Sequence, residues 1–454
     1  MAAGQGGVGA RQWSTAGRAG AGHRRTRTPN QPGGCRAQRP GQPSAADSAR
    51  AATVTAADEL VSHDGQPSAN PQPVVHSARP VSLSRGRRDN TVLILAVLGY
   101  SVLSLIALAV GVYLLSFLGG GAFIVAGILA VIPLIIVLIG IRWIDRWEPE
   151  PRGALVFAFL WGAAASVAIA LIFDLGVQII AAAVGVGDGF WVTFFGLVVQ
   201  APIVEEVGKG FGLLVLFWAI RRQFDGPVDG VVYGAMIAVG FAFTENVQYF
   251  GIALAESQVP GDVGEIFVMR GLMSPFAHVM FTACTGLVMG FASRRASPGG
   301  MIGWWLLGLL PAIALHAFWN ASALFVTNFY AYYFTVQVPL FIIGFVIVFF
   351  LRGQERTLTR RHLQEYADAG WFTQQEVALL STGQGRRAAA AWARSHGIGD
   401  AFDEFARSAT RLAFARHRIV LGRDVAAATY DEAVMLERVV ANRSRMEGQR
   451  GARI

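Results

Sequence analysis

The sequence predicts an all-α fold, a polytopic membrane bundle of about eight transmembrane helices flanked by two polar regions. The first indication is composition, because 53% of the 454 residues are apolar and only 15% are charged, outside the usual range of soluble domains. The second is a series of apolar runs, each near the roughly 20 residues that a helix needs to span hydrocarbon. The third is the position of the arginines between these runs.

The predicted spans lie at about residues 91–117, 121–141, 154–183, 190–220, 228–254, 267–293, 301–325 and 331–351. Arginines flank them on alternate sides only, at Arg85, Arg87 and Arg88, then Arg142 and Arg146, Arg221 and Arg222, Arg294 and Arg295, and Arg352 and Arg356. Positively charged loops favour the cytoplasmic side of a membrane. The alternation therefore predicts a multi-pass protein of the cell membrane with both termini in the cytoplasm.

Residues 1–88 are predicted to be a disordered tail. They contain 12 arginines against 4 acidic residues, and they have too few large apolar side chains to offset the entropy cost of ordering. The arginines lack aromatic interleaving, which favours a solvated arm near anionic lipid over specific binding of nucleic acid. The first apolar run begins after about 90 residues and is too long for a secretory signal, so we expect it to be an anchor.

Residues 89–352 form the predicted membrane domain, and residues 353–454 a small helical cytoplasmic region. The latter holds 16 arginines against 12 acidic residues, much alanine, and apolar residues at loose helical spacing. This periodicity is typical of core packing. Its sequence offers no group of catalytic residues, so we expect a structural role.

Two adjacent glutamates and the chain's single lysine lie inside the fourth predicted span, in Val199-Gln-Ala-Pro-Ile-Val-Glu-Glu-Val-Gly-Lys209. On a helix, Lys209 shares one face with Glu205 and another with Glu206, so it can neutralise part of their charge. One ionised group at the bilayer centre costs about 2.5–3.5 kcal/mol, so three would cost on the order of 8 kcal/mol before pairing. Such a cost indicates a functional site.

The ionisable residues of the eight spans are Asp174, Glu205, Glu206, Lys209, Glu245, His278 and His316, with Arg270 near a span end. At ~1.5 Å per residue, Glu205 lies roughly 22 Å from the outer end of its span. By the same rise, Glu245, His278 and His316 lie roughly 12–17 Å from the outer ends of theirs. We therefore predict that four helices bring these groups together, whereas Asp174 falls near the outer interface and is expected to be an end-of-helix or partner residue rather than a catalyst.

Three prolines precede the polar side chains of their spans by three to five residues: Pro202, Pro275 and Pro311. Each removes a backbone hydrogen bond and loosens its helix. Such backbone is tolerated at membrane depth where it faces protein or a water-filled cavity. Prolines are also commoner in membrane helices generally, but three beside polar residues favour the walls of a hydrated pocket.

Three carboxylates and one lysine leave a formal charge of about −2 when both histidines are neutral, which calls for protonation or a cation in a site of low dielectric. A divalent metal, zinc by its ligand preference, suits two imidazoles and a carboxylate, with a further glutamate as general base. The same residues also suit a reaction without metal, in which Glu205 takes a proton from water. A histidine or Asn320, four residues after His316, would then stabilise the oxyanion. Spacing alone leaves both mechanisms open.

Four motifs occur in chain order: Ala201-Pro-x-x-Glu-Glu-x-x-Lys209, Gly240-Phe-Ala-Phe-Thr-Glu-Asn246, His278, and His316-x-x-x-Asn320. Together with Asp145-Arg-Trp-Glu-Pro-Glu-Pro151, they resemble the PrsW family of intramembrane metalloproteases. That family is similar to the wider group of CAAX prenyl endopeptidases and bacteriocin-processing enzymes. Here Glu245 stands where that wider group has histidine, which separates the two mechanisms. The resemblance covers about residues 90–350 and neither tail.

The resemblance implies cleavage of a peptide bond in or beside the membrane, in a membrane-anchored protein such as an anti-sigma factor. It implies that Glu205 activates water and that Glu206 and Lys209 tune it. It also implies that Glu245, His278 and His316 bind a metal or polarise the carbonyl, as in the family's description as a metalloprotease. Asn320 would belong to the catalytic set.

Two other classes of protein are compatible with the composition. A proton- or cation-coupled transporter would also place glutamates and a lysine at mid-membrane, although it often shows inverted repeats with broken helices, and the eight predicted spans show none. A non-catalytic membrane scaffold would leave the costly buried charges unexplained. The sequence therefore favours the intramembrane endopeptidase.

Overall fold

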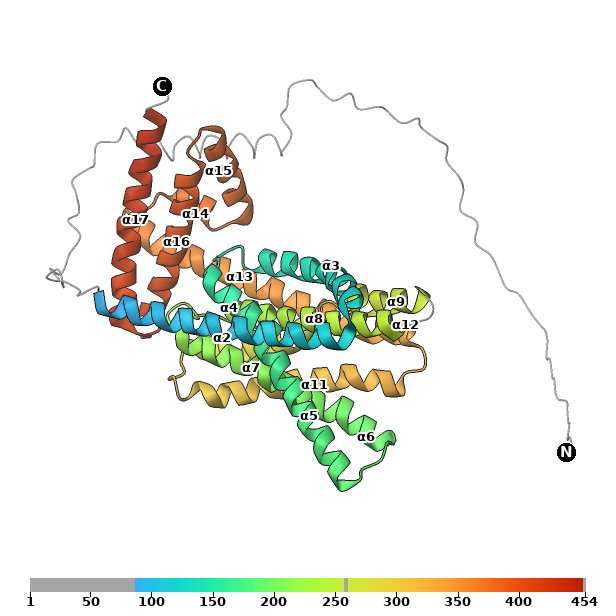
Figure 1. Ribbon diagram of the computed structural model, residues 1–454. Coiled ribbons are helices and arrows are strands. Elements are labelled where there is room, and N and C mark those ends of the chain that lie inside the picture. The colour runs from blue at the N-terminus through green and yellow to red at the C-terminus, as the bar shows by residue number, and fades with distance from the viewer. Residues whose placement is uncertain (1–85, 257–259, 452–454) are drawn as a thin grey trace, which may run out of the picture. The chain divides into compact units, whose positions relative to one another are not determined.

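The computed structural model describes residues 86–256 and 260–451, and every regular element in these ranges is helical (Figure 1). The α-helices and π-helical segments (η) are α2 (Gly86–Leu118), α3 (Gly120–Ile144), α4 (Arg152–Leu160), η1 (Trp161–Ser166), α5 (Val167–Val184), α6 (Phe190–Phe194), η2 (Phe195–Gln200), α7 (Ala201–Ala219), α8 (Pro227–Glu256), α9 (Pro260–Ile266), η3 (Phe267–Met273), α10 (Ala277–Ser293), α11 (Met301–Phe325), α12 (Phe329–Tyr332), η4 (Tyr333–Gln337), α13 (Val338–Asp368), α14 (Gln374–Leu380), α15 (Gly383–Ser395), α16 (Gly399–Val420) and α17 (Val425–Gly451). The predicted all-α class is confirmed. The predicted disordered tail lies outside the described residues, apart from residues 86–88, which belong to α2.

Eight stretches of the described residues are long and apolar enough to cross a membrane, as predicted. They are Leu93–Leu118, Gly120–Ile144, Arg152–Val184, Phe190–Ala219, Pro227–Glu256, Val263–Ser293, Met301–Phe325 and Phe329–Asp368. The third, fourth, sixth and eighth contain a π-helical segment. Such segments often occur at functional sites.

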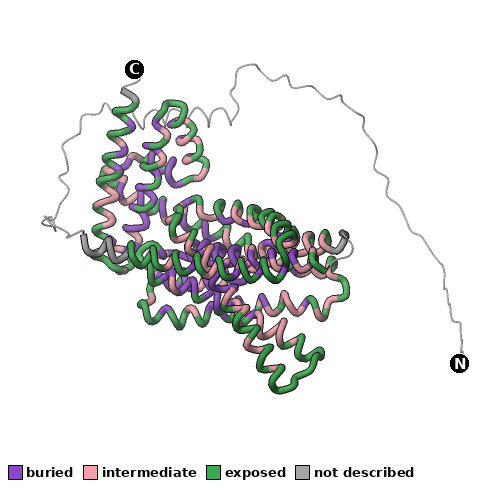
Figure 2. Tube along the Cα trace, in the orientation of Figure 1, coloured by how far each residue is buried: buried purple, intermediate pink, exposed green. Residues whose placement is uncertain are grey.

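Helix α8 lies at the centre of the bundle, and 94% of its apolar membrane-spanning stretch is buried. Figure 2 shows it as the most continuously buried helix. It packs against α3, α4, α7, α10 and η1. Glycines permit this close approach, because a Cβ on Gly230 would lie 1.9 Å from the carbonyl oxygen of Gly286 and one on Gly240 would lie 2.1 Å from that of Phe159. Small residues at helix contacts drive packing in membranes.

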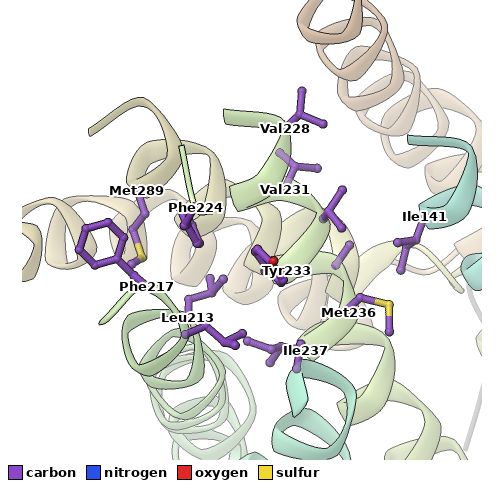
Figure 3. Packing of buried hydrophobic residues seen from close by; sticks show 14 of the residues in the cluster. Ile141, Leu213, Phe217, Phe224, Val228, Val231, Tyr233, Met236, Ile237 and Met289 are labelled. Atoms are coloured by element: carbon purple, nitrogen blue, oxygen red, sulfur yellow. The ribbon is translucent and has the colours of Figure 1, made fainter. Parts of the chain in front are cut away.

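The interior of the membrane part is formed by fully buried side chains from α7, α8 and α10. Figure 3 shows Leu213 and Phe217 of α7, Tyr233 and Ile237 of α8, and Met289 of α10 in one cluster. Outward faces of the bundle remain apolar, as on α2, α3 and α5, which suits contact with lipid. The core therefore fixes α7 and α8, which carry four of the ionisable residues predicted for the site.

The C-terminal helices form a second core. Helix α13 runs without a break from the last span to Asp368, past the predicted domain boundary after residue 352. Helices α14–α17 group around its end (Figure 1), and their core includes Leu363, Phe372, Phe405 and Leu412. The predicted boundary after residue 352 therefore lies inside α13, where the helix passes from the membrane part to the C-terminal core.

Arginines attach this C-terminal region to loops of the membrane part. The Arg386 guanidinium lies 3.6 Å from the ring centroid of Trp147, and burial lowers the pKa of Arg386 to about 9. Arg418 donates to the carbonyl of Arg222, and Arg423 to that of Arg221. These contacts hold the loop that directly follows α7.

Candidate functional site

The two glutamates and the lysine of α7 meet as their spacing predicts. Lys209 Nζ lies 2.6 Å from Glu206 Oε1 and 3.4 Å from Glu205 Oε2. Glu206 and Lys209 are fully buried, whereas the Glu205 side chain is 13% exposed. Glu206 and Lys209 thus form a buried ion pair, and Glu205 stands at its edge.

Residues of α10 and α11 complete the environment of Glu206. Thr282 donates its hydroxyl to Glu206 Oε2 at 2.8 Å. His316 Nδ1 lies 3.1 Å from Glu206 Oε1. A carboxylate only accepts hydrogen bonds, so Nδ1 of His316 carries the proton and donates. In neutral His316, Nε2 then keeps a lone pair, and it lies 3.8 Å from Glu205 Oε2.

His278 of α10 is held from two sides. Its Nδ1 lies 3.3 Å from Lys209 Nζ, and its Nε2 lies 2.8 Å from Glu245 Oε2. An ammonium group only donates hydrogen bonds, so Nδ1 accepts and Nε2 carries the proton that Glu245 accepts. Each imidazole is therefore fixed by one glutamate. The other nitrogen of His316 keeps a lone pair, whereas that of His278 accepts from Lys209.

Arg270 of η3 belongs to the same cluster, which sequence reasoning missed. Its guanidinium lies 2.6 Å from Glu245 Oε2 and stacks 3.7 Å above the ring centroid of Tyr249. In the sequence, Arg270 stands out only as an ionisable residue near the end of the span that carries His278. That position was the only sign that Arg270 could belong to the site. With Arg270 included, three carboxylates face two cations, so one net negative charge remains where the sequence implied two.

Glu205, His278 and His316 are the possible metal-binding group that the described residues contain, with one ligand atom from each within 4.8 Å of the others. The family resemblance implies Glu245 as the carboxylate ligand beside the two histidines. In the structure Glu245 instead pairs with Arg270 and orients His278. Two imidazoles and one carboxylate are a usual zinc ligand set, and carboxylates that fix the far nitrogens of histidine ligands are typical of such sites. The residues present therefore fit a divalent metal.

Asn320 points elsewhere. Its Nδ2 donates to the carbonyl oxygen of Leu197 in η2 at 2.9 Å, although it lies on the same helix face as His316. The contact ties α11 to the π-helical segment that precedes α7. The geometry therefore gives Asn320 a link to the backbone rather than to the ionisable cluster.

A cavity of about 250 Å³ gives access to Glu205 and Glu245. Its other lining residues are Val167, Ala170, Leu171, Phe173, Asp174, Gly196, Gln200, Ala201, Val204, Phe241, Gln248 and Tyr249. Asp174 accepts hydrogen bonds from Gln178 and Gln200, and it lies within α5 (Val167–Val184) rather than at a helix end. A polar pocket bounded by α5, η2, α7 and α8 thus reaches the exposed edge of the buried cluster.

The proline-bearing acidic loop lies at the other end of α8. Glu150 accepts a hydrogen bond from the Tyr233 hydroxyl at 2.6 Å, and burial raises the pKa of Glu150 well above its usual range. Tyr233 and Glu245 are twelve residues apart on α8, or roughly 18 Å at the helical rise. The loop therefore supports α8 away from the ionisable cluster.

Comparison with known proteins shows which family the membrane part of the chain is similar to. Residues 150–348 match the family described as "PrsW family intramembrane metalloprotease". The chain is 33% identical over 161 residues to "Protease PrsW" of Clostridioides difficile (strain 630), covering 35% of this chain and 62% of that protein. It is 27% identical over 201 residues to "Protease PrsW" of Bacillus subtilis (strain 168), covering 44% and 83%.

A third relative extends the same match. The chain is 30% identical over 149 residues to "Protease PrsW" of Geobacillus kaustophilus (strain HTA426), covering 33% of this chain and 58% of that protein. The chain thus spans less than two thirds of the length of two of these three relatives. No solved structure is significantly similar to it. The matched segment contains all seven residues proposed from the sequence for the site, and this part of the chain is similar to the PrsW family.

Proposed function

We propose that this protein is an intramembrane endopeptidase that hydrolyses a peptide bond in or near the membrane-spanning part of another protein. The family match and the eight apolar spans support this proposal. The observation that carries it is the grouping of Glu205, His278 and His316 beside a cavity inside those spans.

Glu205 is proposed to take the proton from the attacking water. It lines the cavity, its side chain is partly exposed, and Lys209 approaches it no closer than 3.4 Å. Glu206 is committed to Lys209, Thr282 and His316, and it lies at full burial. General bases must come within hydrogen-bond reach of the proton that they remove, and Glu205 meets this condition from the cavity side.

The buried pair behind Glu205 is proposed to position the histidines. Glu206 accepts from His316 Nδ1, and Lys209 donates to His278 Nδ1. The tautomer of each ring is thereby fixed without contact with the substrate. Preorganised groups of this kind avoid reorganisation during the reaction.

A divalent metal, zinc by its donor set, would be held by His278, His316 and one carboxylate oxygen of Glu205, and His278 Nδ1 would give up its contact with Lys209 when the metal binds. When bound, it would polarise the scissile carbonyl and lower the pKa of bound water. The second oxygen of Glu205 would remain available for the proton. Chelation followed by re-addition of zinc tests this point, because activity that persists in fully metal-stripped protein rules the metal out.

The proposed substrate is a single-pass membrane protein, with a membrane-anchored anti-sigma factor as the class that the family resemblance suggests. The proposed orientation has both termini in the cytoplasm, which rests on the arginines of alternate loops. The surrounding bilayer is the second proposed partner. No specific role for nucleic acid is proposed.

Comparative membrane proteomics of wild-type and Glu205→Gln cells tests the activity. We expect single-pass proteins to accumulate uncut in the variant. Asp174→Asn is the matched control, because Asp174 lines the same cavity and its carboxylate accepts hydrogen bonds from the amides of Gln178 and Gln200. Equal processing in wild-type and Glu205→Gln cells would refute the assignment.

A further inference from the structure

One face of α13 continues from the last span into the polar C-terminal region and is hollowed along its length. The groove measures about 660 Å³. It is lined by Val346, Phe349, Phe350, Gly353, Gln354, Thr357, Leu358, Arg361, His362 and, from α16, His417. The α13 positions recur every three or four residues, so they form a single stripe. The groove lies far along the sequence from the ionisable cluster and is independent of the proposed hydrolysis.

The first half of the stripe is apolar and exposed. Val346, Phe349 and Phe350 are 62%, 65% and 63% exposed. They belong to the last membrane span, so acyl chains of the bilayer would cover them. A ligand seated here must offer hydrocarbon to this half of the groove.

The second half of the stripe is polar and begins within one helical turn. Gln354 and Thr357 follow Phe350 by about 6 and 10 Å at the helical rise, and Arg361 by about 16 Å. Side chains on a helix lean toward its N-terminus, which brings the Arg361 guanidinium back toward the membrane. Headgroups occupy the layer just outside the hydrocarbon, so the polar half lies where a headgroup would be.

A histidine pair closes the polar end. His362 Nδ1 lies 3.1 Å from Glu365 Oε1, and His362 Nε2 lies 3.2 Å from His417 Nδ1. Since the carboxylate accepts, neutral His362 donates from Nδ1 and accepts from His417. Nε2 of His417 then keeps a lone pair, and this buried atom has no hydrogen-bond partner among the described residues. His417 thus lines the groove and has one acceptor nitrogen that no described residue uses.

The surroundings of this nitrogen are positive. Burial, followed by Arg294, His362 and Arg361, lowers the pKa of His417 to about 4. The acidic Glu365 is already engaged by His362 and by Arg416 Nε at 2.9 Å. The polar end therefore favours an anion that also carries a hydrogen-bond donor, and it disfavours an ammonium group.

We propose that this groove binds an anionic phospholipid whose headgroup bears a hydroxyl group, such as phosphatidylglycerol. The acyl chains lie along Val346, Phe349 and Phe350, the phosphate meets Arg361, and the headgroup hydroxyl donates to His417 Nε2. The apolar half requires the lipid rather than a soluble phosphate. The charge and the unpartnered nitrogen select its headgroup.

Native mass spectrometry of the full chain in nanodiscs measures which lipids it retains. This experiment tests whether Arg361 gives the groove its preference for anionic lipid. Wild type should retain phosphatidylglycerol over phosphatidylcholine, and Arg361→Gln should reduce that preference about fivefold, the effect of one basic residue near a lipid surface. Arg360→Gln is the matched control, because Arg360 is exposed and adjacent but does not line the groove. Equal losses in the two variants, or no loss in Arg361→Gln, would overturn the proposal.

A second comparison tests the proposed hydrogen bond between the headgroup hydroxyl and His417. Phosphatidylmethanol has the same charge but no headgroup hydroxyl, so wild type should bind it about two- to tenfold more weakly, the range for one hydrogen bond. His417→Ala should remove this difference and keep the preference for anionic lipid. Displacement of bound lipid by millimolar inorganic phosphate would identify a soluble ligand and contradict the proposal, as would an unchanged difference in His417→Ala.

Discussion

His316 Nδ1 lies 3.1 Å from Glu206 Oε1, and this contact turns the other nitrogen of His316 toward Glu205. The glutamate next to the proposed base in sequence thus orients a ring on a different helix. Adjacent glutamates serve two tasks because they point about 100° apart on a helix. Glu206 faces the protein interior, and Glu205 faces the cavity.

The first prediction concerns the buried ion pair of Glu206 and Lys209. Lys209→Met should destabilise the folded protein by about 3–5 kcal/mol, because it leaves Glu206 without its closest cation. Glu206→Gln combined with Lys209→Met should recover at least half of this loss, because the fully buried residue 206 then carries no charge. Thermal unfolding in nanodiscs measures both variants. A Lys209→Met protein as stable as wild type would contradict the ion-pair account.

The second prediction concerns Arg270 and its ion pair with Glu245. Arg270→Gln should lower kcat about 10–100-fold, the usual cost of losing an outer partner of a site, because Glu245 then holds His278 less firmly. KM should change little, since Arg270 acts through Glu245 and not on the substrate. Arg270→Lys keeps the charge and should retain more activity than the glutamine variant. Identical kinetics for the lysine and glutamine variants would argue against a positioning role.

The contact of α8 with α10 makes the third prediction. A Cβ on Gly286 would lie 2.0 Å from the carbonyl oxygen of Gly230, so Gly286→Ala should cost at least about 1–3 kcal/mol through overpacking. Gly303→Ala on α11 is the control, because a Cβ there meets no described atom within 4 Å. Thermal unfolding should separate the two variants. Comparable stability would show that α8 and α10 pack less closely.

Asp225, in the loop between α7 and α8, makes the fourth prediction. Burial and the nearby Asp229 raise the pKa of Asp225 to about 7, against the lowering effect of Arg418 and other arginines. The folded chain therefore keeps a proton that the unfolded chain, with a pKa near ~3.9, releases earlier. Stability should fall as pH rises from about 4 to 7 and level off above that range. In Asp225→Asn, the melting temperature should fall less between pH 5 and 7.5, and an unchanged slope would refute the assignment.

The sequence predicted the helices well because span length and loop arginines are local properties. The eight apolar runs match the eight candidate spans to within a few residues at most ends, and the i, i+3 and i, i+4 spacing correctly paired Lys209 with both glutamates. The continuation of α13 beyond residue 352 was missed, because a change from apolar to polar composition does not require a helix to end.

The parts of the site that were missed depend on contacts between helices. The ion pair between Arg270 and Glu245 joins η3 and α8. The sequence of one span does not indicate which face the other span turns toward it. With Glu245 in that pair, Glu205 is the carboxylate that groups with His278 and His316 as possible metal ligands. Asn320 shares a face with His316, but its contact with Leu197 depends on the π-helical segment η2, for which the sequence has no clear signal.

Cleavage of a co-reconstituted single-pass substrate in proteoliposomes tests the central claim most directly. Wild type and Asp174→Asn should produce the cleaved product, and Glu205→Gln should cleave on the order of 10²–10⁴-fold more slowly, the contribution of a general base. All three proteins should show the same thermal unfolding within error. Cleavage by folded Glu205→Gln at the wild-type rate would contradict the account.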